Sequence, residues 1–297
     1  MRPTSAVTIA CCQPALRIGH VSDNRARIRE AILAAAGVGA NVVVLPELAH
    51  CGYLFESSDE LRRLAEPLHG PTVREWESLA IQRQLVVVGG VAELGEDGLV
   101  YSTAVLVDET GLRGSYRKTH LWNTEKTRGF VPGSAAPPVI DTRFGRIGMA
   151  VCYDLEFPEL VRLVALDGAD LLCGPVNWPM FPRPAGERPN EIVRVQADAA
   201  VNRMVVAVAD RTGTERGQEW LGGSVIVDAD GYPVTSPHLG AEAILTATVD
   251  LAQARDKKIS ELNDVHADRR PELYGRCFSQ PDQPGYSART SPLNSRS

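Results

Sequence analysis

The stretch GRIGMAVCYDLEFPE, residues Gly145–Glu159, combines an apolar strand, a sharp turn and the start of a helix. We expect the strand to end at Val151 and the helix to begin near Pro158, because proline is favoured in the first turn of a helix. Cys152 lies in the connection between them. That position offers exposure, backbone N–H donors and the positive end of a helix dipole. It favours covalent acyl chemistry if the chain also supplies a base and an oxyanion stabiliser.

Strands and helices alternate on both sides of this stretch. Several strands are apolar on both faces, which is typical of α/β proteins whose sheets are covered by helices. The pattern leaves open whether there is one sheet or two. Gly37 is placed to close the first helix, and residues 108–111 suit a hairpin turn. The predicted strands are residues 6–12, 41–45, 85–92, 101–107, 112–117, 146–151, 170–173, 204–209, 223–227 and 243–249, and the predicted helices are residues 24–36, 72–83, 158–166 and 187–201.

The chain of 297 residues has no linker-like stretch in its middle. We therefore predict a single domain over residues 1–276. The end of the chain is rich in Pro, Ser, Gly and Arg and has no apolar period. We expect residues 277–297 to form a flexible tail or to lie over a neighbouring subunit.

Composition excludes several classes of function. The net charge is −6 and no basic cluster is present, so nucleic acid is not an expected partner. No stretch is long and apolar enough for a membrane span or a secretory signal, so we expect a cytoplasmic protein. The cysteines form no Cys-x-x-Cys pair and no metal-ligand spacing with histidine, so no metal site is predicted. The six cysteines are Cys11, Cys12, Cys51, Cys152, Cys173 and Cys277.

Three charged residues are candidates for chemistry beside Cys152. Glu47 ends a buried strand, where partial desolvation raises a carboxyl pKa toward a value useful to a general base. Lys118 follows a strand and could stabilise an oxyanion or a thiolate. Glu125 could be a second carboxylate in the same cleft. The plainer interpretation of each is a solvated loop residue, and it is strongest for Glu125.

Other residues have structural explanations. Free cysteines are often buried and inert, which suits Cys11, Cys12 and Cys173 within strands. Cys152 differs because Tyr153 and Asp154 follow it in place of further apolar residues. A Cys–His pair with His120 would need an orienting Asn or Asp. We interpret His120 as a packing or supporting residue.

Three motifs occur in order with wide spacing: LPEL at Leu45–Leu48, YRKTHL at Tyr116–Leu121 and VCYD at Val151–Asp154. Together they resemble the nitrilase superfamily of carbon–nitrogen hydrolases. The resemblance extends over residues 6–274. It includes four further segments: GYLF at 52–55, VNWP at 176–179, GGS at 222–224 and DADG at 228–231.

This resemblance implies a four-layer αββα sandwich whose subunits pair through outer layers into a homodimer or a larger homo-oligomer. It implies a catalytic Glu47–Lys118–Cys152 triad, with Glu125 positioning the substrate and no metal or organic cofactor. Substrate contacts are expected from the residues Tyr53, Tyr153, Asn177 and Trp178. Two departures from the family pattern, Asp210 in place of Asn and Trp220 in place of Phe, could reshape the pocket.

The residues after the nucleophile bear on the substrate. True nitrilases usually have Trp-Glu there, whereas this chain has Tyr153-Asp154, as amidase-like branches do. We therefore expect an amidase that cleaves small carboxamides to acid and ammonia through a cysteine thioester. The alternatives are a nitrilase, an N-carbamoyl amino acid hydrolase, acyl transfer to an amine, and a non-catalytic binding member of the fold. Alkylation of Cys152 well below about pH 8 would separate a reactive thiol from an inert one.

Overall fold

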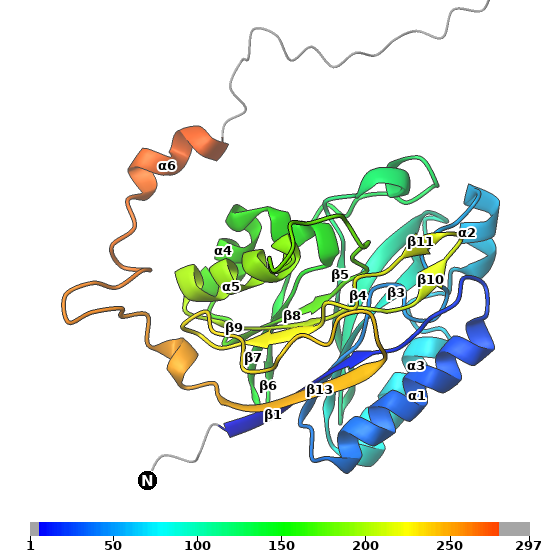
Figure 1. Cartoon of the computed structure of the whole chain (residues 1–297), viewed down its shortest axis with the longest axis horizontal. Coiled ribbons are helices and arrows are strands. Elements are labelled where there is room, and N and C mark those ends of the chain that lie inside the picture. Colours follow the sequence, from blue (N-terminus) through cyan, green and yellow to red (C-terminus); the bar gives the residue numbers. More distant parts are fainter. Residues whose placement is uncertain (1–5, 279–297) are drawn as a thin grey trace, which may run out of the picture. The chain divides into compact units, whose positions relative to one another are not determined.

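The computed structural model describes residues 6–278. These residues belong to two compact units that divide after Lys257. The larger unit holds the sheets and most helices, and the smaller unit contains helix α6 (Pro271–Phe278) (Figure 1). A single domain over residues 1–276 stays a prediction. Most of the predicted tail, residues 279–297, lies outside the described residues.

The first sheet has six strands in the order β13-β1-β2-β3-β4-β5. β1, β2 and β3 run parallel, while β13, β4 and β5 join antiparallel at the two sides. β4 and β5 form the hairpin predicted at residues 108–111, with Asp108 opposite Gly111. The strands are β1 (Ala6–Gln13), β2 (Val42–Val44), β3 (Val86–Leu94), β4 (Val100–Asp108), β5 (Gly111–Arg117) and β13 (Ala243–Asp250).

The second sheet has five strands in the order β12-β9-β8-β7-β6. β7, β8 and β9 run parallel, and β6 and β12 are antiparallel edges. A separate two-stranded hairpin joins β10 (Thr214–Glu215) to β11 (Gln218–Glu219). The strands of the sheet are β6 (Val139–Thr142), β7 (Gly145–Met149), β8 (Leu171–Pro175), β9 (Val205–Ala209) and β12 (Val225–Val227).

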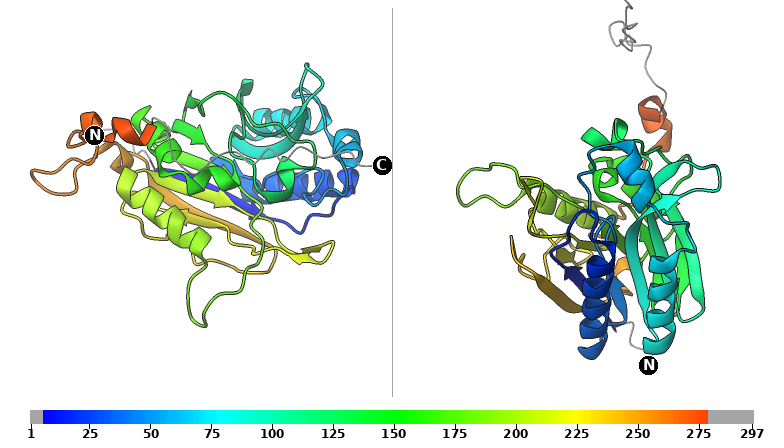
Figure 2. Two further views of the ribbon diagram at one scale, coloured as in Figure 1. Left: turned by 90° about the horizontal axis from the view of Figure 1, so that it is seen from above. Right: turned by 90° about the vertical axis from the view of Figure 1, so that its right-hand side faces the viewer.

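The larger unit has four layers (Figure 2). Alternate residues of β1 and β2 face opposite ways: Ile9 and Val44 pack between the sheets, while Ala10 and Val43 pack under α1 (Val21–Gly37) and α3 (Pro71–Arg83). Helices α4 (Pro158–Leu166) and α5 (Asn190–Asn202) cover the second sheet. The predicted αββα sandwich is confirmed. Within residues 6–278, no helix combines the length and apolarity needed to cross a membrane.

The elements differ from the predictions mainly at their ends. β7 ends at Met149, two residues before the expected Val151. Gly37 does not close α1 as predicted: it is the last helical residue, and Gly39 takes the positive φ of 84°. The sequence pattern missed short elements whose apolar period is too brief to detect, among them α2 (Ser58–Leu64), α6, β6, β10 and β11.

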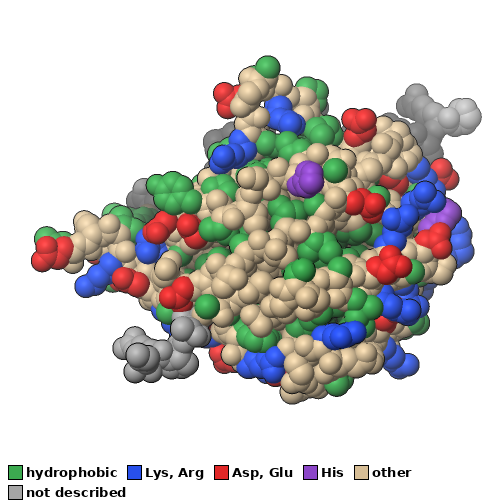
Figure 3. Space-filling model, turned by 60° about the horizontal axis from the view of Figure 1, so that its bottom comes forward, with side chains coloured by type: hydrophobic (Ala, Val, Ile, Leu, Met, Phe, Trp, Pro, Cys, Tyr) green, Lys and Arg blue, Asp and Glu red, His purple; other side chains and the backbone are tan. Residues whose placement is uncertain are grey.

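The face drawn in Figure 3 carries charges of both signs, and neither sign dominates it. There, Lys and Arg side chains lie interspersed with Asp and Glu side chains. A mixed face of this kind does not focus a field of one sign.

Candidate active site

Glu47 is fully buried just beyond the end of β2. Its Oε1 accepts hydrogen bonds from Lys118 Nζ at 2.9 Å and Ser102 Oγ at 3.0 Å, while Oε2 has no partner. Burial raises the pKa of Glu47 to about 7; the positive charge of Lys118 opposes this shift, and the negative charge of Glu125 adds to it. The expectation of a raised pKa is confirmed. Glu47 therefore offers a free carboxylate oxygen that exchanges a proton near neutral pH.

The backbone around Glu47 is held by close contact with β3. Gly90 N–H donates to the Pro46 carbonyl at 3.0 Å, and the Ala49 N–H donates to the Gly90 carbonyl at 2.8 Å. A Cβ at Gly90 would lie 2.6 Å from Glu47 Cα and 2.9 Å from Leu48 N. Only glycine permits this approach, so β3 fixes the position of the Glu47 turn.

Lys118 lies between two carboxylates at the end of β5. Its Nζ is 2.9 Å from Glu47 Oε1 and 2.7 Å from Glu125 Oε1, and its side chain is buried. Burial disfavours the charged ammonium, but Glu125 and Glu47 outweigh it and keep the pKa of Lys118 well above its usual range. Glu125 also accepts hydrogen bonds from Tyr53 Oη at 2.5 Å and Trp122 N at 2.7 Å. Glu125 is thus a buried site residue rather than a solvated loop glutamate.

Cys152 begins a short 3-10 turn (Cys152–Glu156) after β7 and adopts the left-handed φ of 48°. The sequence predicted an exposed side chain, but Cys152 is buried. The residue is 7% accessible, and its Sγ lies 3.8 Å from the Asn177 carbonyl oxygen. Burial and the Glu47 carboxylate raise the pKa of the Cys152 thiol well above its usual range, although Lys118 opposes them. The resting cysteine is therefore a thiol, and a base must remove its proton during reaction.

The predicted substrate-contact residues surround this cluster. Asn177 Nδ2 donates to the Glu47 carbonyl at 2.8 Å, and Asn177 Oδ1 is buried without a partner. Tyr153 is half-buried, and its ring meets Trp122 edge-on at 4.9 Å. Trp178 is 4% exposed and packs in the main core, so its ring offers little free surface.

Sequence reasoning named Asp210 and Asp154 but missed that both are buried and organise the site loops. Asp210 accepts hydrogen bonds from the backbone N–H groups of Trp178, Arg211 and Gly223. Asp154 accepts from the segment that carries Lys118. The available signal was the departure from Asn at position 210, because a carboxylate accepts at both oxygens where an amide cannot.

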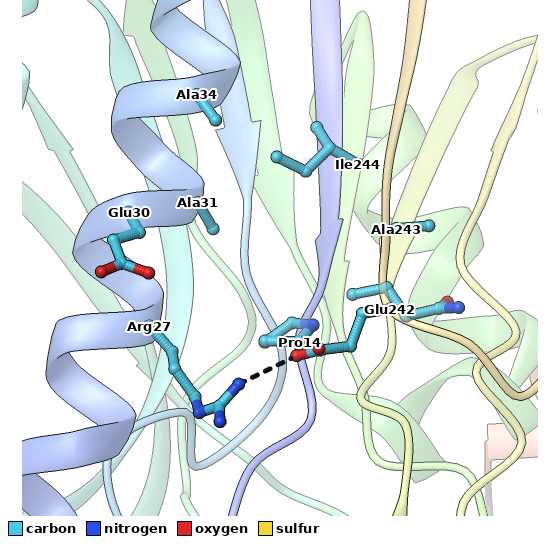
Figure 4. A pocket seen from close by; sticks show the side chains of 9 residues that line it. Pro14, Arg27, Glu30, Ala31, Ala34, Glu242, Ala243 and Ile244 are labelled. Carbon is cyan, nitrogen blue, oxygen red and sulfur yellow. Dashed lines mark hydrogen bonds and ion pairs between the residues drawn. The ribbon is translucent and has the colours of Figure 1, made fainter.

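A second hollow in the larger unit is less suited to chemistry. This hollow of about 380 Å³ lies between α1 and β13 (Figure 4), where an Arg27–Glu242 ion pair spans 3.2 Å. Its buried polar side chain, Gln13, already donates to the carbonyls of His238 and Ala241. Within residues 6–278, no group of three or more His, Cys, Asp or Glu side chains is arranged to hold a metal ion.

Comparison with known proteins identifies the family. The family model described as carbon-nitrogen hydrolase matches residues 8–259. The chain belongs to the carbon-nitrogen hydrolases. This hydrolase is 34% identical to a nitrilase of Pyrococcus abyssi, over 91% of this chain and 100% of the relative. It is also 34% identical to an (R)-stereoselective amidase of a Pseudomonas species, over 92% of this chain and 95% of that protein.

Solved structures of an amidase from a Nesterenkonia species resemble this hydrolase throughout. One has a TM-score of 0.75 and 26% sequence identity, covering 93% of this chain and 98% of that one. A variant of that amidase carries the acetamide moiety of fluoroacetamide on its active-site cysteine. The resemblance to the nitrilase superfamily predicted from the three motifs is therefore confirmed.

Proposed function

We propose that this carbon-nitrogen hydrolase is an amidase that cleaves small neutral carboxamides to acid and ammonia. The observation that carries the proposal is the convergence of Glu47, Lys118 and Cys152 from three separate segments. The Glu47 and Lys118 side chains are hydrogen-bonded at 2.9 Å, and the Cys152 thiol is within the field of both. Buried base, cation and thiol together match what covalent acyl transfer requires.

In the first step, Glu47 takes the proton from the Cys152 thiol, and the sulfur attacks the amide carbonyl carbon. A new C–S bond forms while the C=O electron pair moves onto oxygen. Glu47 suits this role because its pKa is about 7 and its Oε2 has no protein partner. The raised pKa of the thiol means that the thiolate forms only when Glu47 removes the proton for the attack.

Lys118 and the Tyr153 backbone N–H stabilise the resulting oxyanion. Lys118 keeps its proton because Glu125 and Glu47 both face it. Tyr153 is the second residue of the 3-10 turn, and the first N–H groups of a helical turn have no intrahelical partner. Such fixed donors are worth about 3–4 kcal/mol each in acyl transfer.

The second half of the reaction regenerates the enzyme. Glu47 gives the proton to the departing nitrogen, so the C–N bond breaks and ammonia leaves an acyl thioester on Cys152. A water molecule then loses a proton to Glu47 and attacks the thioester carbon. The acid departs, and the sulfur recovers its proton from Glu47.

The charges around the site favour neutral substrates over N-carbamoyl amino acids. Recognition of a substrate carboxylate needs a cation that is not already neutralised. Two cations near the cluster already face carboxylates: Lys118 faces Glu47 and Glu125, and Arg211 faces Glu215.

Ammonia release from short aliphatic amides, their matching nitriles and N-carbamoyl amino acids tests the proposal. We expect release from amides, and a loss of at least about 10³-fold in the Cys152→Ala variant, because the three residues act as a unit. Ammonia release only from nitriles would indicate a nitrilase, and release only from carbamoyl compounds would indicate an N-carbamoyl amino acid hydrolase. Near-normal turnover by Cys152→Ala would refute the thioester mechanism. No release from any compound, with an unreactive Cys152, would favour a binding protein.

A further inference from the structure

Asp154 is fully buried and accepts five hydrogen bonds from two segments. Its Oδ2 accepts from Val151 N and Tyr116 Oη, both at 3.0 Å. Its Oδ1 accepts from His120 N at 3.1 Å, His120 Nδ1 at 2.8 Å and Thr119 Oγ1 at 3.2 Å. Every donor belongs to a residue within two positions of Lys118 or to the residue directly before Cys152.

We propose that Asp154 is a positioning residue that holds the Lys118 segment in register with the Cys152 turn. The proposal rests on the proposed function, because it assigns Asp154 to the alignment of the nucleophile with its cation. Lys118 lies within the segment 116–120, and Cys152 directly follows Val151. The Asp154 carboxylate therefore links the backbone segment that carries Lys118 to the one that carries Cys152. The aromatic ring of His120 is fixed as well, stacked on Phe157 at 3.7 Å.

The energetic reason lies in the buried charges. Cys152 is faced by Glu47, Lys118, Glu125 and Tyr53, and Lys118 is the cation among them. If Lys118 withdraws, a thiolate on Cys152 meets only burial and like charge. In a water-poor site the attraction between two charges changes steeply with distance, so a shift of about 1 Å matters.

Only a carboxylate satisfies this set of donors. Each Asp154 oxygen accepts from at least one backbone N–H, from Val151 on one side and from His120 on the other. Asparagine would turn its NH₂ toward one of these N–H groups whichever way it was flipped, leaving two donors opposed. The Asp154→Asn variant therefore disturbs the alignment while keeping the side-chain size.

The test measures iodoacetamide alkylation of Cys152 against pH, followed by mass spectrometry of its peptide. It compares the wild type with Asp154→Asn and with Asp170→Asn as a matched control. Asp170 is also buried and bonded, to Arg255 at 2.9 Å and to Arg146 N at 3.0 Å, but it precedes β8 at the opposite end of the sheet from Cys152. The readout needs no substrate, so it remains informative if amides are not hydrolysed.

We expect Asp154→Asn to slow alkylation at about pH 7 by at least about 10-fold and to move the increase of the alkylation rate to higher pH. For amide hydrolysis, kcat should fall by a larger factor than KM changes. Loss of a negative charge alone would favour the thiolate and move the rise to lower pH, so the direction separates positioning from charge. The Asp170→Asn variant should keep the wild-type profile. An unchanged profile and kcat in folded Asp154→Asn protein would overturn the proposal.

A second pair of variants covers the case in which Asp154→Asn does not fold. His120→Leu removes the Nδ1 donor, whereas His120→Asn keeps a side-chain N–H at a similar distance from the backbone. We expect His120→Leu to slow alkylation several-fold and His120→Asn to restore most of the rate. Equal rates in the two variants would overturn the proposal.

Discussion

At the residue scale, the site is organised around one cation and two carboxylates. Lys118 bonds Glu47 and Glu125 in a region with almost no solvent access. Glu125 is tied on three sides, by Lys118, Tyr53 and Trp122, so it serves as a fixed counterion. Glu47 keeps one oxygen unpaired and is therefore the carboxylate that can carry a proton.

The pKa of Glu47 predicts the pH profile of the enzyme. In the proposed mechanism the base form of Glu47 accepts the thiol proton, so kcat/KM for an amide should rise with pH, with a midpoint near the pKa of about 7. The Glu47→Gln variant should lose this rise and at least about 10³-fold of activity. A steady-state profile between about pH 5 and pH 9 measures both. A rate that is flat across this range in the wild type would contradict the assignment of Glu47 as base.

Tyr53 should contribute to rate more than to stability. In Tyr53→Phe, Glu125 loses a buried hydrogen bond but keeps Lys118 and Trp122 as donors. We expect kcat to fall about 10-fold, while the free energy of unfolding falls by no more than about 1–2 kcal/mol. Tyr101→Phe is the control, because its hydroxyl bonds Asp97 at 2.6 Å outside the site. Similar kcat values in the two variants would argue against a role for Tyr53.

Part of this site was predictable from residue context. A glutamate after a buried strand indicated a raised pKa, and the structure has one at Glu47. The burial of Cys152 was not predictable, because loops distant in sequence cover it, including the one that carries Asn177. The hydrogen bonds of Asp154 were not predictable, because contacts across 34 residues leave no trace in local spacing.

At the element scale, the long strands and helices followed from their apolar periods. Pro158–Leu166 matches the predicted helix residue for residue, because proline and glycine bracket its apolar face. The 3-10 turn that begins at Cys152 was expected only as a connection. Its left-handed first residue depends on the contacts around it rather than on the sequence of the turn.

The contact between β3 and the Glu47 turn predicts a strong effect of one methyl group. In Gly90→Ala the new Cβ would meet backbone atoms of Glu47 and Leu48, which cannot yield as a flexible side chain can. We expect a loss of about 1–3 kcal/mol of stability and a loss of activity beyond what the lost stability explains. Thermal unfolding and kcat measure the two effects. Gly37→Ala is the control: its Cβ meets nothing within 4 Å, so stability should stay equal or rise slightly.

At the scale of the whole larger unit, sequence pattern gave the α/β class but not the number of sheets. Both sheets have apolar faces on each side, so periodicity alone could not divide the strands between them. The family resemblance supplied the four layers. The layers also bury acidic groups on different segments: Glu47, Asp198 and Asp210 each have a pKa raised to about 7, chiefly by burial.

These carboxylates predict how stability depends on pH. A carboxyl whose pKa is raised on folding binds its proton more tightly in the native state. Its contribution is present below the unfolded pKa of about 4 and is lost as pH rises through about 7. The free energy of unfolding should therefore fall between about pH 4 and pH 7.

Asp198 is the member of this set that can be tested without disturbing the catalytic cluster. Its Oδ2 is buried and unpaired on α5, as is Asn202 Oδ1 one turn further along the helix. In Asp198→Asn the charge disappears, and the new NH₂ can donate to Asn202 Oδ1. We expect stability at about pH 8 to rise by on the order of 1–3 kcal/mol, with little change at about pH 4. Urea unfolding at both pH values measures this, with the exposed Asp141→Asn as control. A gain of equal size at both pH values would show that the removed charge is not its cause.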